Sequence, residues 1–146
     1  MHFSGLEISH LSLNGEGVAT AGRRKVFVPG VLPGECIDAD STELKAKIAR
    51  AKIKRLHTPS RQRTEPRCAH LPACGGCDWQ HIDYAAQLQF KSQQLQRQLR
   101  LFSRLEQVPE PQILSDQAFE YRSRARLLIE WSGTTPHLSM RALSSR

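Results

Sequence analysis

Residues 10–35 read HLSLNGEGVATAGRRKVFVPGVLPGE, and this stretch decides the fold class. Short apolar runs alternate with glycine- and proline-containing turns, and the glycines supply the positive backbone φ angles that tight strand connections need. The predicted strands are residues 3–9, 17–20, 25–28 and 35–39. Such even spacing of short strands predicts a small β-barrel. Its expected interior residues are Val26, Val28, Val31 and Ile37.

The next segment, residues 44–56, reads LKAKIARAKIKRL and is strongly basic. Lys45 and Lys47 alternate with apolar residues, whereas Arg50, Lys52 and Lys54 take the opposite phase. A bulged strand would explain this slip. A short basic helix is the competing interpretation, because Ala, Lys and Arg are good helix formers. Either structure presents one cationic face.

The charge of the whole chain points to a polyanionic partner. Among its 146 residues, 21 Lys and Arg face 14 Asp and Glu, so the net charge is +7 and the pI is about 9.7. No run approaches the roughly 18 apolar residues of a membrane span, and the start lacks a signal-peptide pattern. We therefore expect a cytoplasmic chain without a membrane anchor.

Three cysteines lie within ten residues, in the pattern Cys68-x5-Cys74-Gly-Gly-Cys77. Thiolates on a short, glycine-containing loop suit either zinc or an iron-sulfur cluster. His70 or His81 could complete a Cys3His zinc site, and the spacing does not decide between the two metals. A disulfide framework is disfavoured, because cytosolic thiols stay reduced and three cysteines cannot pair evenly. Cys36 stands apart and is expected to be a small core residue.

The remaining sequence predicts a linker, a helix and a strand. Residues 58–67 carry two prolines and three arginines and no large apolar side chain, which predicts an exposed linker at the barrel boundary. Asp83 can cap a helix that runs to about Phe102. The helix stripe that we expect to be core consists of Tyr84, Leu88, Lys91, Leu95, Leu99 and Phe102. Residues 127–131 look like a strand.

Three segments resemble the bacterial RNA uracil-5-methyltransferase family, in the branch that modifies large-subunit ribosomal RNA. EPRCAHLPACGGCDWQHIDYAAQLQFK, residues 65–91, is similar to the family's cluster segment. Residues 10–35 resemble its TRAM domain, a small OB-like RNA-binding barrel. FEYRSRARLLIEW, residues 119–131, resembles the start of the central domain. The resemblance covers nearly the whole chain, as the N-terminal portion of such a protein.

The resemblance implies a fold that is mainly β at first: an OB-like TRAM barrel (1–57), a linker and iron-sulfur loop (58–82), then a helix and the beginning of a mixed α/β central domain (83–146). It implies that Cys68, Cys74 and Cys77 help to bind a 4Fe-4S cluster. The family's fourth cysteine ligand, its S-adenosylmethionine site, its cysteine nucleophile and its glutamate base have no counterpart here. We therefore expect no catalytic residue in this chain.

The implied partner is ribosomal RNA, bound by a monomer, and Trp79, Gln80 and His81 beside the cysteines could also meet it. A stand-alone zinc-containing nucleic-acid-binding module is the alternative. The candidate RNA-binding residues are Arg23, Arg24, Lys25, Lys45, Lys47, Arg50, Lys52, Lys54 and Arg55.

Overall fold

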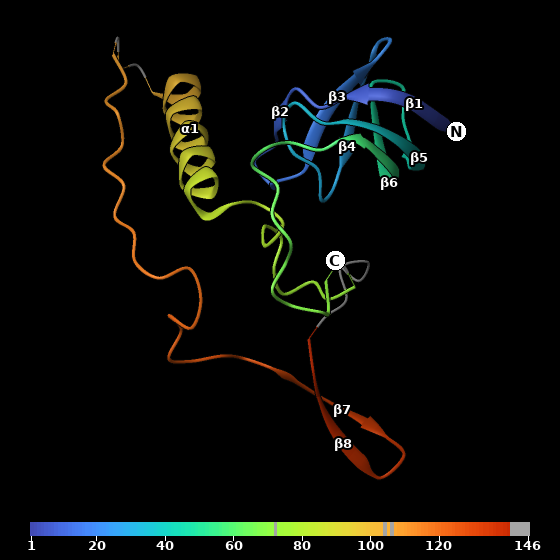
Figure 1. The fold of residues 1–146 in the computed structure, drawn as a ribbon, viewed down its shortest axis with the longest axis vertical. Helices are drawn as coiled ribbons and strands as arrows, with labels where there is room; N and C mark the ends of the chain where they lie inside the picture. The colour runs from blue at the N-terminus through green and yellow to red at the C-terminus, as the bar shows by residue number, and fades with distance from the viewer. Residues whose placement is uncertain (72, 104, 106, 141–146) are drawn as a thin grey trace.

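The computed structural model describes residues 1–71, 73–103, 105 and 107–140. Its strands are β1 (His2–Glu7), β2 (His10–Leu11), β3 (Gly17–Ala21), β4 (Arg24–Val28), β5 (Cys36–Leu44), β6 (Ile48–Thr58), β7 (Leu128–Ser132) and β8 (Thr135–Ser139). The described helix is α1 (Tyr84–Phe102). Figure 1 shows the first six strands gathered at one end of the molecule, with α1 beside them and the β7–β8 hairpin at the far end.

The first six strands form one mixed sheet in the order β1-β5-β6-β4-β3-β2. Strands β4 and β6 pair in parallel, and the other neighbours are antiparallel. Strand β1 also packs against β3, so the sheet curls round on itself. The predicted barrel-like β domain at the start of the chain is therefore confirmed.

The barrel interior is made by alternate residues of these strands. All four predicted core residues, Val26, Val28, Val31 and Ile37, have 0% of their surface exposed. Each such side chain contributes about 1.5–3 kcal/mol when it leaves water. Alanines of β6 fill the space opposite β4, since Ala49 pairs with Val26 in the register.

The interpretation of residues 44–56 as one strand or a helix was partly wrong. Leu44 ends β5, residues 45–47 form the turn, and β6 begins at Ile48. The basic residues change from odd to even positions because the chain reverses direction at this turn. The alternation of basic and apolar residues along one strand ends there. A register shift does occur further on: Asp38 pairs with Arg55 and Ala39 with Ile53, which leaves Lys54 as an extra residue.

Helix α1 begins and ends close to the predicted residues. The Asp83 side chain accepts hydrogen bonds from the backbone N–H groups of Ala85 and Ala86, at 3.0 and 3.3 Å, and so caps the helix. The prediction that its apolar stripe is core was wrong. Leu95 is 49% exposed and Phe102 is 81% exposed, because the described part of the chain covers only the first turns of α1.

A second apolar cluster joins α1 to the barrel. It consists of Leu11, Leu32, Ile82 and Ala86, with Trp79 and Phe90 packed against it. One turn after Phe90, the side-chain amide of Gln94 donates a 2.7 Å hydrogen bond to the carbonyl of Ser12. The start of the helix is thus fixed to the β2–β3 end of the barrel.

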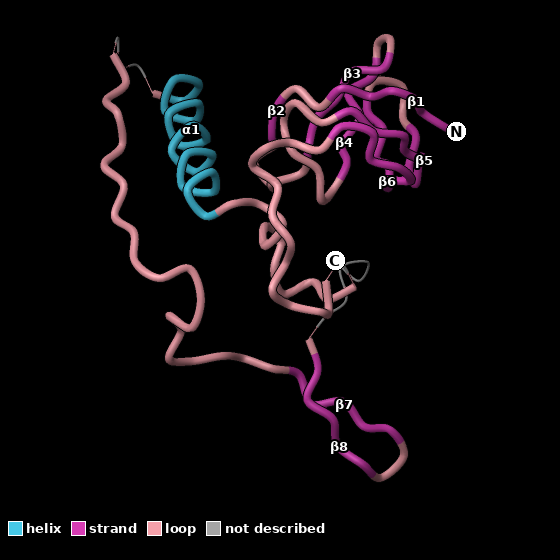
Figure 2. Tube along the Cα trace, in the orientation of Figure 1, coloured by secondary structure: helices cyan, strands magenta, loops and turns pink. Residues whose placement is uncertain are grey.

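The final described region is an extended chain followed by a hairpin. Figure 2 shows a long loop from the end of α1 to β7. Among the described residues, strands β7 and β8 pair with no other strand, and Gly133, with φ of 62°, lies in the turn between them. The predicted strand at residues 127–131 corresponds to β7. Its side chains are exposed, including Ile129 at 65% and Trp131 at 68%.

Candidate nucleic-acid interface and cysteine loop

Five of the nine predicted RNA-binding residues gather at one end of the barrel. They are Arg23 and Arg24 at the β3–β4 turn, Lys25 in β4, and Lys45 and Lys47 in the β5–β6 turn. Backbone contacts hold the two turns together. Arg24 Nε donates to the Lys45 carbonyl at 3.1 Å, and the Lys25 N–H donates to the Lys47 carbonyl at 3.0 Å.

This basic end is hollowed. A depression of about 540 Å³ is lined by Met1, Ala21, Gly22, Arg23, Arg24 and Ala46. Its lining places short apolar side chains beside two arginines, whose guanidinium groups are donors of the kind that contact phosphates.

Acidic residues on β5 and in the β2–β3 turn neutralise part of the basic surface. Arg50 pairs with Glu16 at 2.5 Å and lies 3.7 Å from Glu43, which also pairs with Lys45 at 2.7 Å. The Arg50 guanidinium also lies 6.0 Å from the ring centroid of Phe27. Arg50 is thus engaged within the barrel, so its role in binding RNA is weaker than its charge alone suggests.

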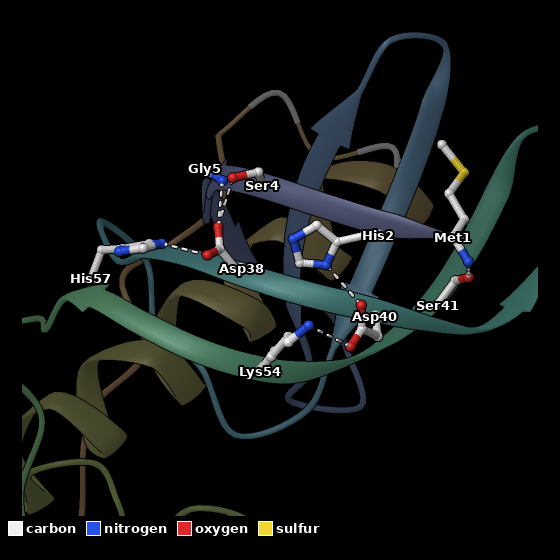
Figure 3. A network of polar contacts seen from close by, with 9 residues as sticks. All are labelled: Met1, His2, Ser4, Gly5, Asp38, Asp40, Ser41, Lys54 and His57. Atoms are coloured by element: carbon white, nitrogen blue, oxygen red, sulfur yellow. Dashed lines mark hydrogen bonds and ion pairs between the residues drawn. The ribbon is translucent and has the colours of Figure 1, made fainter.

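Strand β5 carries the acids that offset β6. Figure 3 shows Asp40 between His2 and Lys54, at 2.7 and 3.8 Å, and Asp38 facing His57 at 2.9 Å. Asp38 also accepts hydrogen bonds from Ser4 Oγ and the Gly5 N–H, both at 3.0 Å. The His57 hydrogen bond, with that of Gly5, holds the pKa of Asp38 well below its usual value.

Six of the nine predicted residues have no ion pair within the described residues. Two of them are held by hydrogen bonds instead, Arg24 to the Lys45 carbonyl at 3.1 Å and Lys25 to Thr20 Oγ1 at 3.0 Å. The other four are Arg23, Lys47, Lys52 and Arg55. All but Arg23 lie in or just before β6. An unpaired surface cation keeps its full charge for a phosphate group. These four residues are therefore the stronger part of the predicted set.

The three clustered cysteines lie on one loop but do not converge. Cys68 and Cys74 are half-buried, Cys77 is exposed, and Cys74 Sγ accepts a 3.4 Å hydrogen bond from the Gly76 N–H. Among the described residues, no group of three or more His, Cys, Asp or Glu side chains is placed to hold a metal ion. The donor chemistry suits a metal, whereas this arrangement of the thiols does not fit one.

The residues beside the cysteines are packed rather than presented to solvent. Gln80 Oε1 accepts a 3.2 Å hydrogen bond from the Cys68 N–H, and Trp79 meets the Phe90 ring edge-on at 6.3 Å. His81 Nε2 is buried and has no hydrogen-bond partner within the described chain. Burial lowers the pKa of His81 to about 4, and the nearby charge of Arg63 adds to this effect.

A buried ion pair, which the sequence did not suggest, anchors the cysteine loop to the barrel. Arg63 Nε and Nη2 donate to the two oxygens of Glu35 at 2.6 and 2.7 Å, and Glu35 is 0% exposed. Burial tends to raise the pKa of Glu35, but hydrogen bonds from Arg63, Leu32 and Ser60 lower it overall. The segment 58–67, expected to be an exposed linker, is thus fixed at its centre.

Cys36 lies in the predicted strand but not in the buried core that was expected for it. It begins β5 opposite Glu7 of β1, and it is half-buried. It lies in a different part of the fold from the cysteine loop, so the structure keeps it apart from the three clustered thiols.

None of the described helices is long and apolar enough to cross a membrane. No family model matches the chain.

Individual relatives are more informative. A protein of Shewanella halifaxensis named 23S rRNA (uracil(1939)-C(5))-methyltransferase RlmD is 39% identical over 96% of this chain, which covers 32% of that relative. The proteins of the same name from Vibrio vulnificus (strain YJ016) and Shewanella sp. (strain ANA-3) are 39% and 40% identical over 85% and 98% of the chain. The chain spans about a third of the length of these curated relatives. The matches confirm the resemblance to the RNA uracil-5-methyltransferase family.

Proposed function

We propose that this chain is the RNA-binding, N-terminal part of a ribosomal RNA uracil-C5-methyltransferase. Its parts would be a TRAM-like barrel (1–57), a linker with the cysteine loop (58–82) and the beginning of a central domain (83–146). The observation that carries the proposal is a set of three cations in the β5–β6 turn and β6 that have no ion pair within the described residues, Lys47, Lys52 and Arg55, in a chain whose relatives are named as 23S rRNA methyltransferases.

The chain's own contribution would be to bind and orient RNA. When cations without acidic partners contact phosphates, the counterions condensed on the RNA are released. This release gives affinity without sequence preference. The hollow at Arg23 and Arg24 could add a contact to an unstacked base. Methyl transfer from S-adenosylmethionine would be the work of parts outside this chain.

We also propose Cys68, Cys74 and Cys77 as ligands of a 4Fe-4S cluster. Three soft donors on one loop, with Gly75 and Gly76 between them, support the assignment. Because the thiols do not converge here, we derive no step of the reaction from such a cluster. Its role would be to hold the loop in shape.

The metal assignment is tested by anaerobic reconstitution with iron and sulfide, followed by iron analysis and absorbance. Cys74→Ser should abolish iron binding, and Cys36→Ser should leave the iron content unchanged. One equivalent of zinc, with no iron retained by the wild type, would instead support the stand-alone zinc module.

The RNA-binding proposal is tested with labelled single-stranded ribosomal RNA at several salt concentrations. Replacing Lys47, Lys52 and Arg55 by Gln removes three proposed phosphate contacts, so the slope of log K against log salt should fall by about 2. The control is the variant R61Q/K91Q/R100Q, which removes three exposed charges outside the barrel. Equal losses in the two variants would show that only net charge matters and would contradict the proposal.

A further inference from the structure

The chain that leads into β7 carries a second basic surface. Residues 119–126 read FEYRSRAR, and Arg122, Arg124 and Arg126 occupy alternate positions. All three are exposed and have no ion pair within the described residues. The chain bends at Ser123, and all three guanidinium groups lie on one exposed stretch, residues 122–126, where they can meet the phosphates of one backbone.

Aromatic rings are interleaved with these arginines. Tyr121 is 60% exposed, and the Arg122 guanidinium lies 5.6 Å from its ring centroid. Phe119 is 36% exposed and lies under the guanidinium of Arg67 at 4.7 Å. Exposed rings next to cations are the elements with which proteins bind single strands, because bases stack on the rings while the cations meet phosphates.

The chain from Phe119 to Met140 contacts the cysteine loop, or the residue just before it, near each of its two ends. Near the first end, Arg67 stacks on Phe119 and lies 3.7 Å from Glu120. Near the second end, beyond the hairpin, the Met140 side chain packs so closely on Gly76 that its Cε lies 2.7 Å from where a Cβ would stand. The arginines thus have a defined place relative to the cysteine loop.

This surface is separate from the barrel. Figure 1 shows the extended chain running into β7 below the cysteine loop, on the side away from strands β1 to β6. A single RNA would have to pass the cysteine loop to reach both surfaces. Two linked contacts on one molecule raise the overall affinity above that of either alone.

We propose that residues 119–126 form a second binding surface for single-stranded RNA. Arg122, Arg124 and Arg126 contact the phosphates, and Tyr121 stacks on a base. This inference rests on the proposed function, since it assigns a further contact with the same RNA. It makes the binding of long single strands tighter than the binding of short ones.

The test compares three triple variants of the 146-residue chain, each lacking three positive charges: R122Q/R124Q/R126Q, the barrel variant K47Q/K52Q/R55Q, and the control R61Q/K91Q/R100Q. Each is titrated with a labelled single strand of about 20 nucleotides at several salt concentrations, after its unfolding midpoint has been matched to the wild type. The R122Q/R124Q/R126Q variant should lower the salt slope by about 2, beyond the control.

Stacking is tested separately at Tyr121. Tyr121→Ala should weaken single-strand binding by about 5- to 100-fold, and Tyr121→Phe, which keeps the ring, should retain it. The inference is overturned if R122Q/R124Q/R126Q has the same salt slope as the control variant. It is also overturned if Tyr121→Ala and Tyr121→Phe both bind RNA as tightly as the wild type. In either case the proposed function stands as long as the barrel variant still loses affinity. A wild-type chain that binds no RNA would overturn the proposed function with it.

Discussion

The indole ring of Trp79 lies against Gly15, in the space that a Cβ on Gly15 would need. Gly15 belongs to the β2–β3 turn and has φ of +80°, while Trp79 follows Cys77 by two residues. The same indole meets Phe90 of α1 edge-on. This one side chain therefore joins the barrel, the cysteine loop and the helix.

Gly15→Ala should destabilise the chain by two effects. A left-handed φ costs a non-glycine residue about 1–2 kcal/mol, and displacing Trp79 adds about 1–3 kcal/mol of overpacking. Gly30→Ala is the matched control, because Gly30 has φ of +76° but nothing within 4 Å of its Cβ position. Urea unfolding followed by tryptophan fluorescence measures both. Equal losses would mean that Trp79 moves aside without cost.

Arg63→Ala should lower the free energy of unfolding by about 3 kcal/mol, since it leaves the charge of Glu35 buried without its partner. Arg61→Ala, two residues away and exposed, should change stability by less than about 0.5 kcal/mol. Thermal unfolding at pH 7 distinguishes the two variants. A small effect of Arg63→Ala would show that water reaches Glu35 when the guanidinium is removed.

Asp38 should make the barrel sensitive to acid. Its pKa is lower in the folded chain than its ordinary value of 3.8, so its ionised form stabilises the fold above about pH 4, and this contribution is lost as the pH falls further. Asp38→Asn should therefore flatten the loss of stability below pH 4. Asp116→Asn, in the exposed chain before β7, serves as the control. Parallel acid curves for Asp38→Asn and the wild type would contradict the assignment.

S-adenosylmethionine should not bind this chain by itself. None of the described strands leads through a glycine-rich turn into a helix, which is the unit that holds such a cofactor in doubly wound folds. Calorimetric titration should show no heat of binding at micromolar cofactor. Measurable affinity would show that residues 1–146 contain a cofactor site of another kind.

Local signals in the sequence predicted much of the fold. Val26 and Val28 are β-branched residues at alternate positions, and Asp83 is followed by a long run of helix formers, so a strand and a helix could be assigned from neighbours alone. The Glu35–Arg63 pair could not be, because it depends on how residues 28 positions apart meet in three dimensions.

Cross-strand register explains what the sequence missed at the candidate interface. Asp40 lies 3.8 Å from Lys54 only because β5 and β6 are antiparallel with this register. Counting charges along the chain therefore overstated the positive potential of β6. The exposed stripe of α1 was misjudged for a related reason: periodicity identifies an apolar face but says nothing about what covers it.

The parallel pairing of β4 with β6 has a consequence for synthesis on the ribosome. Strand β4 is made early, but its partner on that edge is completed only at Thr58, and β1 has no partner until β5 has been made. Until then the nascent chain exposes unpaired strand edges at both ends of its growing sheet. We expect the barrel to close late and in a single event as β5 and β6 leave the exit tunnel, so ribosome-bound chains that still hold β6 inside it should be cut readily by protease.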